Sequence, residues 1–445
     1  MSAEQLGSTP HRVETTRKSL ERYRGIVGDD LVAEIRDRAH DLRGLRVLEV
    51  SAAATGGGVA EMLSSLVPLQ RDVGLDVEWE LITADAEFFE LTKKLHNGLQ
   101  GMDVEIGEAE LDAYLAHNEA HAKALGDDWD VIVIHDPQPA AVRSFTPDSG
   151  GRWVWRCHVD SSSPNSAVWE FLRPYVEAHD HAVFTIEDFI PEDLSLPTST
   201  QVPAIDPLTS KNRNLPAYVA RETVADLGID LTRPLLLQVS RFDPWKDPLG
   251  VVEVWRQVRE TFPDLQLALV GSMASDDPEG WRIYSQLEER VHGERDCFLF
   301  SDQTGVASHE VNAFQRVADV VIQKSIREGF GLIVSETLWK GTAIVAGRAG
   351  GIPLQLEDGV SGGRLAEKTD EFAAAVQGLL EDPVEARRLG AAGAQRVGER
   401  FLAPRLLLDQ LELLGELTGL EYPVGERGGA VAFRPARSGY RPSGG

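Results

Sequence analysis

Short runs of apolar residues, each followed by a segment long enough for a helix, constrain the fold of this chain more than any other feature. In the first half of the chain they are LRVLEV (residues 45–50), WDVIVIH (129–135), RWVWRCH (152–158) and HAVFTI (181–186). Runs rich in Val, Ile and Leu at this spacing are typical of parallel strands that crossover helices bury on both faces. The first half is therefore predicted to be a βαβ domain.

A second series of the same kind follows a polar segment, IDPLTSKNRNLP (205–216), which has two prolines and no periodicity. Its runs are PLLLQVS (234–240), LQLALVG (265–271), CFLF (297–300), DVVIQ (319–323) and TAIVAG (342–347). A chain of 445 residues also exceeds what one hydrophobic core usually holds. We predict an α/β protein of two Rossmann-like, doubly wound domains that face a central cleft.

The predicted boundaries follow from the same pattern. The first domain spans 1–214 and the second spans 215–399. The helical stretch at about 400–421 is expected to pack back on the first domain. The Gly-, Pro- and Arg-rich tail at 423–445 is expected to be disordered.

The charge balance excludes several classes of partner. The chain carries 44 Lys and Arg against 71 Asp and Glu, a formal net charge of -27. A surface this acidic repels nucleic acid and anionic lipid, so neither is expected as a partner. A phosphate site in such a protein must be built from a few local cations and backbone amides.

The expected cellular location follows from the signal segments, membrane-spanning segments and cysteine patterns that the sequence lacks. The N-terminal residues include no apolar signal segment, and no run of about eighteen apolar residues occurs. The two cysteines, Cys157 and Cys297, match no disulfide or zinc pattern. We therefore expect a cytoplasmic protein.

The first candidate site is the glycine run at 56–58, between the run LRVLEV and a helical pattern. Gly57 and Gly58 would let the backbone approach a ligand and leave helix-start amides free for an anion or a sugar hydroxyl. A tight turn from strand to helix explains these glycines equally well.

The second candidate site is the loop RFDPWKDP, which directly follows the run PLLLQVS. Arg241 and Lys246 lie in this loop, where ligands bind in open α/β sheets, and are well located to neutralise a diphosphate. A solvated basic pair is the alternative.

The third candidate site is the run REGFGLIVSE after DVVIQ. Two glycines around an aromatic residue, followed by a helical pattern, predict a loop whose amides point out at a helix start. Glu328 is expected on the loop and Glu336 two turns into the helix, and their eight-residue separation, close to two helical turns, would let both face one sugar ligand. A pair of solvent-exposed surface carboxylates is the alternative. The donor-binding residues predicted within the loop are Gly329, Phe330, Gly331 and Leu332.

The first domain supplies a further set of polar residues at predicted strand ends. Asp136 and Gln138 follow the run WDVIVIH, and His158 and Asp160 follow RWVWRC. Asp and Gln bind sugar hydroxyls well, so Asp136, Gln138 and Asp160 are the predicted acceptor-binding residues. A structural role is the alternative for a lone histidine such as His158.

Two of these loops carry a resemblance to a known family. An Arg and Lys loop upstream of Glu, seven residues and Glu, with GFGL inside, resembles the retaining glycosyltransferases of family four, which have the GT-B fold. The resemblance implies that Arg241 and Lys246 hold the donor diphosphate, Glu328 the transferred hexose and Glu336 the ribose. Gly350 and Gly351 resemble the glycines of a loop that lies near the donor in this family.

Longer strings narrow this resemblance. GGGVAEML, HNGLQG, HDPQP, VWRCHVD, RFDPWKDP, DDPEGW and VNAFQRVADV are similar to the trehalose glycosyltransferring synthases, with trehalose phosphorylases as near relatives. The likeness covers roughly residues 15–420. It implies a hexosyltransferase that moves glucose reversibly from ADP-glucose, a nucleoside diphosphate sugar, to a second glucose, which gives trehalose. It also implies a homodimer. His158 is implied to contact the donor glucose.

The expected mechanism follows from these roles. No second carboxylate is positioned as a nucleophile, so a covalent intermediate is not expected. The resemblance implies front-face displacement instead, in which the leaving diphosphate takes the acceptor's proton. The expected catalytic residues are Glu328, Arg241, Lys246 and His158, without a protein-bound metal; Mg²⁺ can accompany the nucleotide. A trehalose phosphorylase, a family-four enzyme with another acceptor, and a non-enzymatic sugar-nucleotide sensor remain alternatives.

Overall fold

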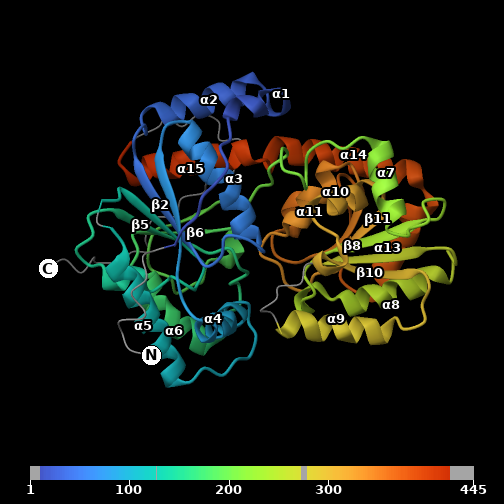
Figure 1. The fold of residues 1–445 in the computed structure, drawn as a ribbon, viewed down its shortest axis with the longest axis horizontal. Coiled ribbons are helices and arrows are strands. Elements are labelled where there is room, and N and C mark those ends of the chain that lie inside the picture. The colour runs from blue at the N-terminus through green and yellow to red at the C-terminus, as the bar shows by residue number, and fades with distance from the viewer. Residues whose placement is uncertain (1–10, 127, 272–277, 421–445) are drawn as a thin grey trace. The chain divides into compact units, whose positions relative to one another are not determined.

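The computed structural model describes residues 11–126, 128–271 and 278–420 of the chain. The chain divides into two compact units, and the first is discontinuous in sequence (Figure 1). It joins Met1–Pro203 with Ala403–Gly445, whereas the second unit is the continuous segment Ala204–Leu402.

The first unit is built on a seven-stranded sheet of order β1-β3-β2-β4-β5-β6-β7. All neighbouring strands are parallel except β1, which pairs antiparallel with β3 at the edge. The strands are β1 (His11–Arg12), β2 (Arg46–Ser51), β3 (Asp76–Leu81), β4 (Val131–His135), β5 (Arg152–Arg156), β6 (His181–Phe184) and β7 (Thr198–Thr200). Because the chain passes from β2 to β3 on one side and later to β4 on the other, the winding reverses between β2 and β4.

Helices cover both faces of this sheet (Figure 1). One group contains α2, α3 and α15, which pack together, and the other contains α4, α5 and α6. The α-helices are α1 (Arg24–Val27), α2 (Asp29–His40), α3 (Gly58–Asp72), α4 (Ala86–Leu99), α5 (Glu108–Ala124), α6 (Ser166–Val176) and α15 (Ala403–Leu417). Short 3-10 helices are η2 (Leu20–Tyr23), η3 (Val142–Phe145) and η4 (Glu187–Phe189).

The second unit is built on a six-stranded parallel sheet of order β10-β9-β8-β11-β12-β13. Numbered along the unit this is 3-2-1-4-5-6, the Rossmann order, and its winding reverses between β8 and β11. The strands are β8 (Leu235–Val239), β9 (Gln266–Gly271), β10 (Cys297–Ser301), β11 (Val320–Gln323), β12 (Ile344–Gly347) and β13 (Gly363–Ala366).

Helices also lie on both faces of the second sheet, with α8, α9 and α13 in one group and α7, α10, α11 and α14 in the other (Figure 1). The α-helices are α7 (Ala217–Asp226), α8 (Pro248–Arg259), α9 (Pro278–Arg290), α10 (Ser308–Val317), α11 (Leu332–Trp339), α12 (Ile352–Gln355), α13 (Thr369–Glu381) and α14 (Pro383–Arg400). The 3-10 helices are η5 (Pro244–Lys246) and η6 (Asp302–Thr304).

The apolar runs are buried strands, as a parallel sheet covered on both faces requires. Every residue of β4, β8 and β9 is buried, and so is every residue of β2 after Arg46. The prediction of two Rossmann-like α/β domains is confirmed by the two sheets and their helices.

The division between the units differs in detail from the predicted boundary. Residues 204–214, which we assigned to the first domain, belong to the second unit. The reason is local: Asn312 on α10 donates to the backbone oxygens of Ser210 and Arg213, and Ile205 forms a β-bridge with Leu402. In the C-terminal helical stretch, α15 belongs to the first unit and contacts α2 and α3. The predicted tail at 423–445 lies outside the described residues.

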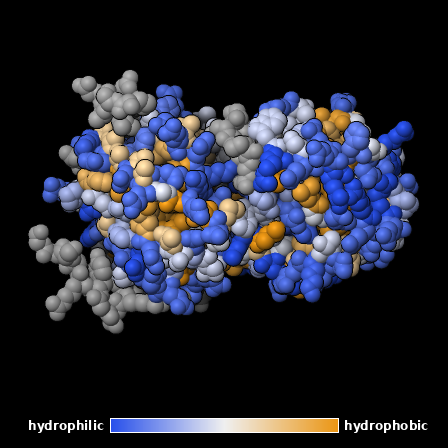
Figure 2. Space-filling view, turned by 90° about the horizontal axis from the view of Figure 1, so that it is seen from below, coloured by the Kyte–Doolittle hydropathy of each residue, from blue (hydrophilic) through white to orange (hydrophobic). Residues whose placement is uncertain are grey.

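On the face shown in Figure 2, hydrophilic residues cover most of the surface, with smaller groups of hydrophobic residues between them. Within the described part of the chain, no helix combines the length and the apolar character needed to cross a membrane.

Candidate functional site

The loops that follow β8 and β11 carry the candidate site of the second unit. These strands are neighbours at the point where the winding of the sheet reverses. At such a point the two loops leave in opposite directions and open a crevice at the carboxyl ends of the strands, where open α/β sheets bind their ligands. The predicted residues Arg241, Lys246 and Glu328 lie on these two loops.

Lys246 and Glu328, which are far apart in sequence, are in direct contact. Nζ of Lys246 donates to Oε2 of Glu328 at 2.7 Å, and the two side chains are only 15% and 12% exposed. The hydroxyl of Ser325 donates to the same oxygen at 3.2 Å. The carboxylate of Glu328 is therefore fixed in place before any ligand binds.

Side chains from the strands β8 and β11 fix the backbone of both loops. Gln238 on β8 donates to the backbone oxygen of Lys246 at 2.9 Å, and Gln323 on β11 donates to the Ser325 hydroxyl at 3.0 Å. Asp247 accepts from the backbone N–H of Gly250 at the start of α8 and forms an ion pair with Lys324. This arrangement limits the movement of Lys246 and Glu328.

Arg241 is in a different environment from Lys246. Its side chain is 50% exposed, and one guanidinium nitrogen lies 3.1 Å from Oδ2 of Asp243. The other oxygen of Asp243 accepts from the backbone N–H of Trp245 at 2.8 Å and caps η5. Arg241 can therefore change its rotamer to meet a ligand, while Asp243 remains fixed.

The first three residues of the GFGL segment form the end of the loop before α11. The Phe330 side chain is buried and packs against Phe401, so it supports the loop, and its backbone oxygen accepts from Gln355. Gly331 has a φ of 83°, and a Cβ there would lie 3.1 Å from Cγ of Glu328. The backbone of Gly329 is held by Gly351, whose N–H donates to the Gly329 oxygen at 3.0 Å. Leu332 is the first residue of α11.

Glu328 and Glu336 lie on the loop and on the helix that the sequence predicts for them. Because α11 begins only at Leu332, Glu328 lies in the loop and Glu336 in the second turn of the helix. Glu336 is fully buried, and its Oε1 lies 2.9 Å from Nζ of Lys211. The structure therefore brings Lys246 and Glu328 together but places Glu336 in a separate ion pair.

In the first unit, the glycine run lies between β2 and α3. Gly57 is the N-cap of α3 and Gly58 is its first residue. Gly56 has a φ of 86°, whereas Gly57 has an extended φ of -151° and a Cβ added to it would meet no atom within 4 Å. The protein itself does not require Gly57 to be glycine, so an approaching ligand remains the reason we propose.

Asp136 and His158 lie together at the carboxyl ends of β4 and β5. Oδ1 of Asp136 accepts from the backbone N–H of His158 at 2.8 Å. Asp136 has a φ of 63°, an unusual conformation for a residue other than glycine. Burial raises the pKa of Asp136 to about 7, against the opposing effects of the His158 N–H and Arg156.

The other two predicted acceptor residues have different surroundings. The Gln138 backbone oxygen accepts from Asn118, and its side chain is partly exposed. Asp160 is buried, and its Oδ1 accepts from both the N–H and the hydroxyl of Ser162, which holds the turn after β5. Asp160 therefore stabilises local backbone structure in addition to any part in binding.

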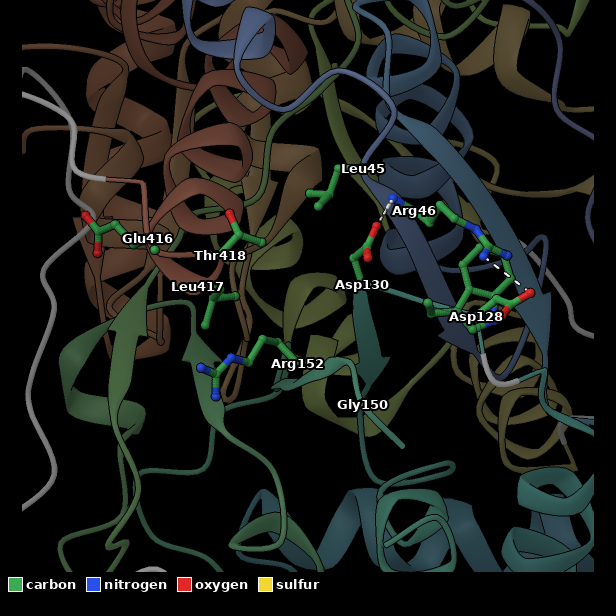
Figure 3. A pocket seen from close by; sticks show the side chains of 11 residues that line it. Leu45, Arg46, Asp128, Asp130, Gly150, Arg152, Glu416, Leu417 and Thr418 are labelled. Carbon is green, nitrogen blue, oxygen red and sulfur yellow. Dashed lines mark hydrogen bonds and ion pairs between the residues drawn. The ribbon is translucent and has the colours of Figure 1, made fainter. Parts of the chain in front are cut away.

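A separate pocket of about 730 Å³ lies in the first unit, and none of the predicted site residues lines it (Figure 3). Arg46 at the start of β2 contacts Asp130 and Asp128 there, and Arg152 begins β5. The pocket is thus at the amino ends of the strands, away from the edge that carries Asp136 and His158. Among the described residues, no group of three or more His, Cys, Asp or Glu side chains is arranged to hold a metal ion.

The sequence reasoning missed several partners of the predicted residues. Lys324 follows the run DVVIQ and Lys211 lies in the polar segment 205–216, and nothing in their spacing pointed to Asp247 or Glu336. Glu49 and His135 are polar residues inside apolar strands, and both are about 1% exposed. A carboxylate in the middle of a buried strand was a usable signal, because such groups are rare unless paired.

Comparison with known proteins agrees with both units. Residues 49–191 match the family described as trehalose synthase, N-terminal domain, and residues 219–396 match glycosyl transferases group 1. A trehalose synthase from Rubrobacter xylanophilus is 49% identical over 415 residues, covering 92% of this chain and 99% of the relative.

More distant similarities extend in two directions. A trehalose phosphorylase from Pleurotus pulmonarius is 28% identical over 406 residues, covering 77% of this chain and 53% of the relative. The solved structure of a sucrose-phosphate synthase from Thermosynechococcus elongatus superposes with a TM-score of 0.66 at 19% identity, covering 84% of this chain and 99% of that one. The second likeness concerns the fold alone. With two Rossmann-like units and these relatives, the chain belongs to the trehalose synthase family of GT-B glycosyltransferases.

Proposed function

We propose that this hexosyltransferase transfers glucose reversibly, with retention, between a nucleoside diphosphate and a second glucose, so that trehalose is product in one direction and substrate in the other. ADP-glucose is the proposed donor. The proposal is supported by the 49% identity to a trehalose synthase along nearly the whole chain.

The contact between Lys246 and Glu328 is the structural observation that carries this function. It joins a cation suited to phosphate and a carboxylate suited to sugar hydroxyls at the reversal point of a Rossmann sheet. A nucleotide sugar has both groups, with the glucose bonded directly to the diphosphate. One small site can therefore hold the bond that breaks.

The proposed reaction uses these residues without a covalent intermediate. The bond between the anomeric carbon and the diphosphate breaks, and the acceptor hydroxyl attacks from the same face and gives its proton to the leaving phosphate oxygen. Lys246 and Arg241 stabilise the charge that develops on the diphosphate, and Glu328 orients the glucose. Asp136 and Gln138 are proposed to bind the acceptor, and Glu336 the ribose.

A trehalose phosphorylase is the second candidate, because one such enzyme is 28% identical over 77% of this chain. The same cations would then hold inorganic phosphate, which would attack trehalose directly. The two functions differ only in the co-substrate.

The deciding experiment incubates the protein with trehalose and either ADP or inorganic phosphate, and measures released glucose. We expect release with ADP, and formation of trehalose with the α configuration at both anomeric carbons from ADP-glucose and glucose, detected by proton NMR. Release with phosphate alone would replace the proposal by the phosphorylase. Tight nucleotide binding without turnover under any condition would indicate a sensor and contradict both.

Three accompanying proposals have simple tests. Light scattering tests the homodimer, fractionation of the source cells tests the cytoplasmic location, and chelation with EDTA tests the part of Mg²⁺. We propose that Mg²⁺, where it contributes, enters with the nucleotide, so EDTA should change nucleotide affinity and leave the fold unchanged.

A further inference from the structure

A row of three polar side chains crosses the buried sheet of the first unit and ends at His158. Oε2 of Glu49 on β2 lies 2.8 Å from Nε2 of His135 on β4, and Nδ1 of His135 lies 2.9 Å from Nε2 of His158. The two imidazole rings are nearly parallel, with centroids 5.2 Å apart. Glu49 and His135 are buried, while His158 is partly exposed.

Each contact in this row needs one donor and one acceptor, and this requirement orders the protons. An ionised carboxylate only accepts, so Nε2 of His135 carries the proton that it donates to Glu49. A neutral His135 then has a lone pair on Nδ1, and Nε2 of His158 must donate to it. A neutral His158 is left with a lone pair on its own Nδ1.

The charges around the row support this order. The positive charge of Arg156 on β5 attracts Glu49, Asp136 and Asp409 on α15, so a buried cation lies close to the row. Burial and the nearby Arg156 lower the pKa of His158 well below its usual value. Burial also lowers the pKa of His135, with Glu49 opposing and Arg156 adding to the shift. Both rings are thus neutral near pH 7.

The position of His158 is fixed from the other side as well. Its backbone N–H donates to Asp136, whose left-handed φ of 63° turns the chain at the end of β4. The backbone and one ring nitrogen of His158 are therefore both held by the protein, and one ring nitrogen is left for a ligand.

We propose that Glu49 and His135 are positioning residues that hold His158 in its Nε2–H form, so that Nδ1 always accepts a hydrogen bond from a hydroxyl of the transferred glucose. The sugar contact rests on the proposed function; the proton order in the ligand-free protein does not.

The first test reads the proton positions directly. Long-range proton–nitrogen NMR on protein labelled with ¹⁵N in its histidine rings distinguishes a protonated from an unprotonated ring nitrogen, and a His158→Asn variant assigns the signals. We expect Nε2 of both His135 and His158 to carry the proton at pH 7 without ligand. A proton on Nδ1 of His158 would overturn the proposal.

The second test reverses the row with one isosteric change. In Glu49→Gln, Arg156 attracts the single amide oxygen, which favours turning the NH₂ group toward Nε2 of His135. That nitrogen must then accept, His135 donates from Nδ1, and His158 is left with its proton on Nδ1. We expect kcat/KM for ADP-glucose to fall about three- to tenfold, as for the loss of one neutral hydrogen bond.

A set of donors that each lack one hydroxyl adds a specific readout. For the wild type, kcat/KM should be about three- to tenfold higher with ADP-glucose than with the one donor that lacks the hydroxyl bound by His158. Glu49→Gln should lose this difference and keep the preferences for the other hydroxyls. His135→Phe, which keeps a ring but has no acceptor nitrogen, should lose it as well. This second variant keeps the test available if Glu49→Gln folds poorly.

His181→Gln is the matched control, because it removes another buried histidine of the same sheet, bonded at 2.9 Å to Ser199. We expect it to lower stability without altering the His158 tautomer or the hydroxyl preference. If Glu49→Gln leaves the tautomer and the preference unchanged, Glu49 has no positioning role. If the tautomers are as expected but trehalose is never turned over, the proposed function fails and the proton order stands.

Discussion

Three cations of the second unit's site are already paired with carboxylates before a ligand binds. Lys246 pairs with Glu328, Lys324 with Asp247, and Arg241 with Asp243. A diphosphate that enters this site therefore competes with these carboxylates for the three cations. Removing a carboxylate should therefore favour the binding of an anion, and removing a cation should oppose it.

Arg241→Ala and Lys246→Ala test the diphosphate contact. We expect each to weaken donor use by about one to two orders of magnitude, because a charge-assisted hydrogen bond contributes about 1.5–3 kcal/mol. Lys246→Ala should have the larger effect, since Lys246 is less exposed and also orients Glu328. Steady-state kinetics with ADP-glucose measures both.

Arg290→Ala is the matched control for Arg241, because Arg290 is 51% exposed and also paired with one carboxylate, Glu253. Unchanged kinetics in both site variants, equal to that of Arg290→Ala, would remove the diphosphate assignment.

Glu328→Gln and Glu336→Gln should have different kinetic effects. A carboxylate on the glucose contacts it more strongly as the ring gains positive charge, so Glu328→Gln should lower kcat strongly. Nucleotide affinity should be kept or improved, because Lys246 loses its negative partner. Glu336→Gln should chiefly raise KM for the donor, as loss of a ribose contact does.

Calorimetry with ADP and thermal unfolding complete the comparison of the two glutamates. Glu336 is buried against Lys211, so Glu336→Gln should also lower the melting temperature. A lower melting temperature with an unchanged KM would make Glu336 purely structural, and a loss of kcat in Glu336→Gln alone would exchange the two roles.

At the scale of elements, the predicted site rests on turns at the carboxyl ends of β2, β4, β5, β8 and β11. The sequence indicated these turns because each follows an apolar run that only a buried strand satisfies. Lys246 and Glu328 could be assigned to neighbouring loops, since a doubly wound order makes β8 and β11 neighbours. Their direct contact could not be predicted, because it depends on rotamers and on Ser325.

The strands that the apolar pattern did not reveal have specific physical reasons. In β3, DVEWEL, two glutamates interrupt the apolar run, and Glu78 and Glu80 are balanced by Arg12 on β1 at 2.8 and 3.3 Å. That charge pairing joins segments more than sixty residues apart, so no local pattern contains it. The short β7, with sequence TST, and β13, with sequence GRLA, complete their sheets at an edge and have little apolar character of their own.

Gly57→Ala tests the turn between β2 and α3. The added Cβ meets no protein atom within 4 Å and the φ of -151° suits alanine, so the free energy of unfolding should change by less than about 1 kcal/mol. If a ligand approaches this backbone, KM for donor or acceptor should rise severalfold. Kinetics and urea unfolding measure the two effects.

Gly25→Ala is the control for Gly57, since its added Cβ also meets nothing within 4 Å and Gly25 lies in α1 of the same unit. Equal kinetics in the two variants would contradict the approach of a ligand to Gly57.

At the scale of the whole molecule, the sequence neighbours α14 and α15 belong to different units. Leu389 on α14 and Leu407 on α15 are both fully buried, so each leucine-to-alanine change should cost about 2–5 kcal/mol. Leu389→Ala should loosen the second unit, and Leu407→Ala the first, although Leu407 lies more than two hundred residues after Pro203.

Hydrogen exchange followed by mass spectrometry shows where each variant loses protection. We expect faster exchange in β2 and α3 for Leu407→Ala, and in β12 and β13 for Leu389→Ala. The two changes serve as controls for each other, and the same pattern of exchange in both would contradict two separately stable cores.

The return of α15 to the first unit also orders events during protein synthesis. A ribosome completes residues 204–402 before it has made α15, so the second unit can finish folding while the first still lacks the helix that covers α2 and α3. The unit whose synthesis begins first is therefore the last to be complete. Until then the apolar surface that α15 will cover is exposed to chaperones and to other nascent chains.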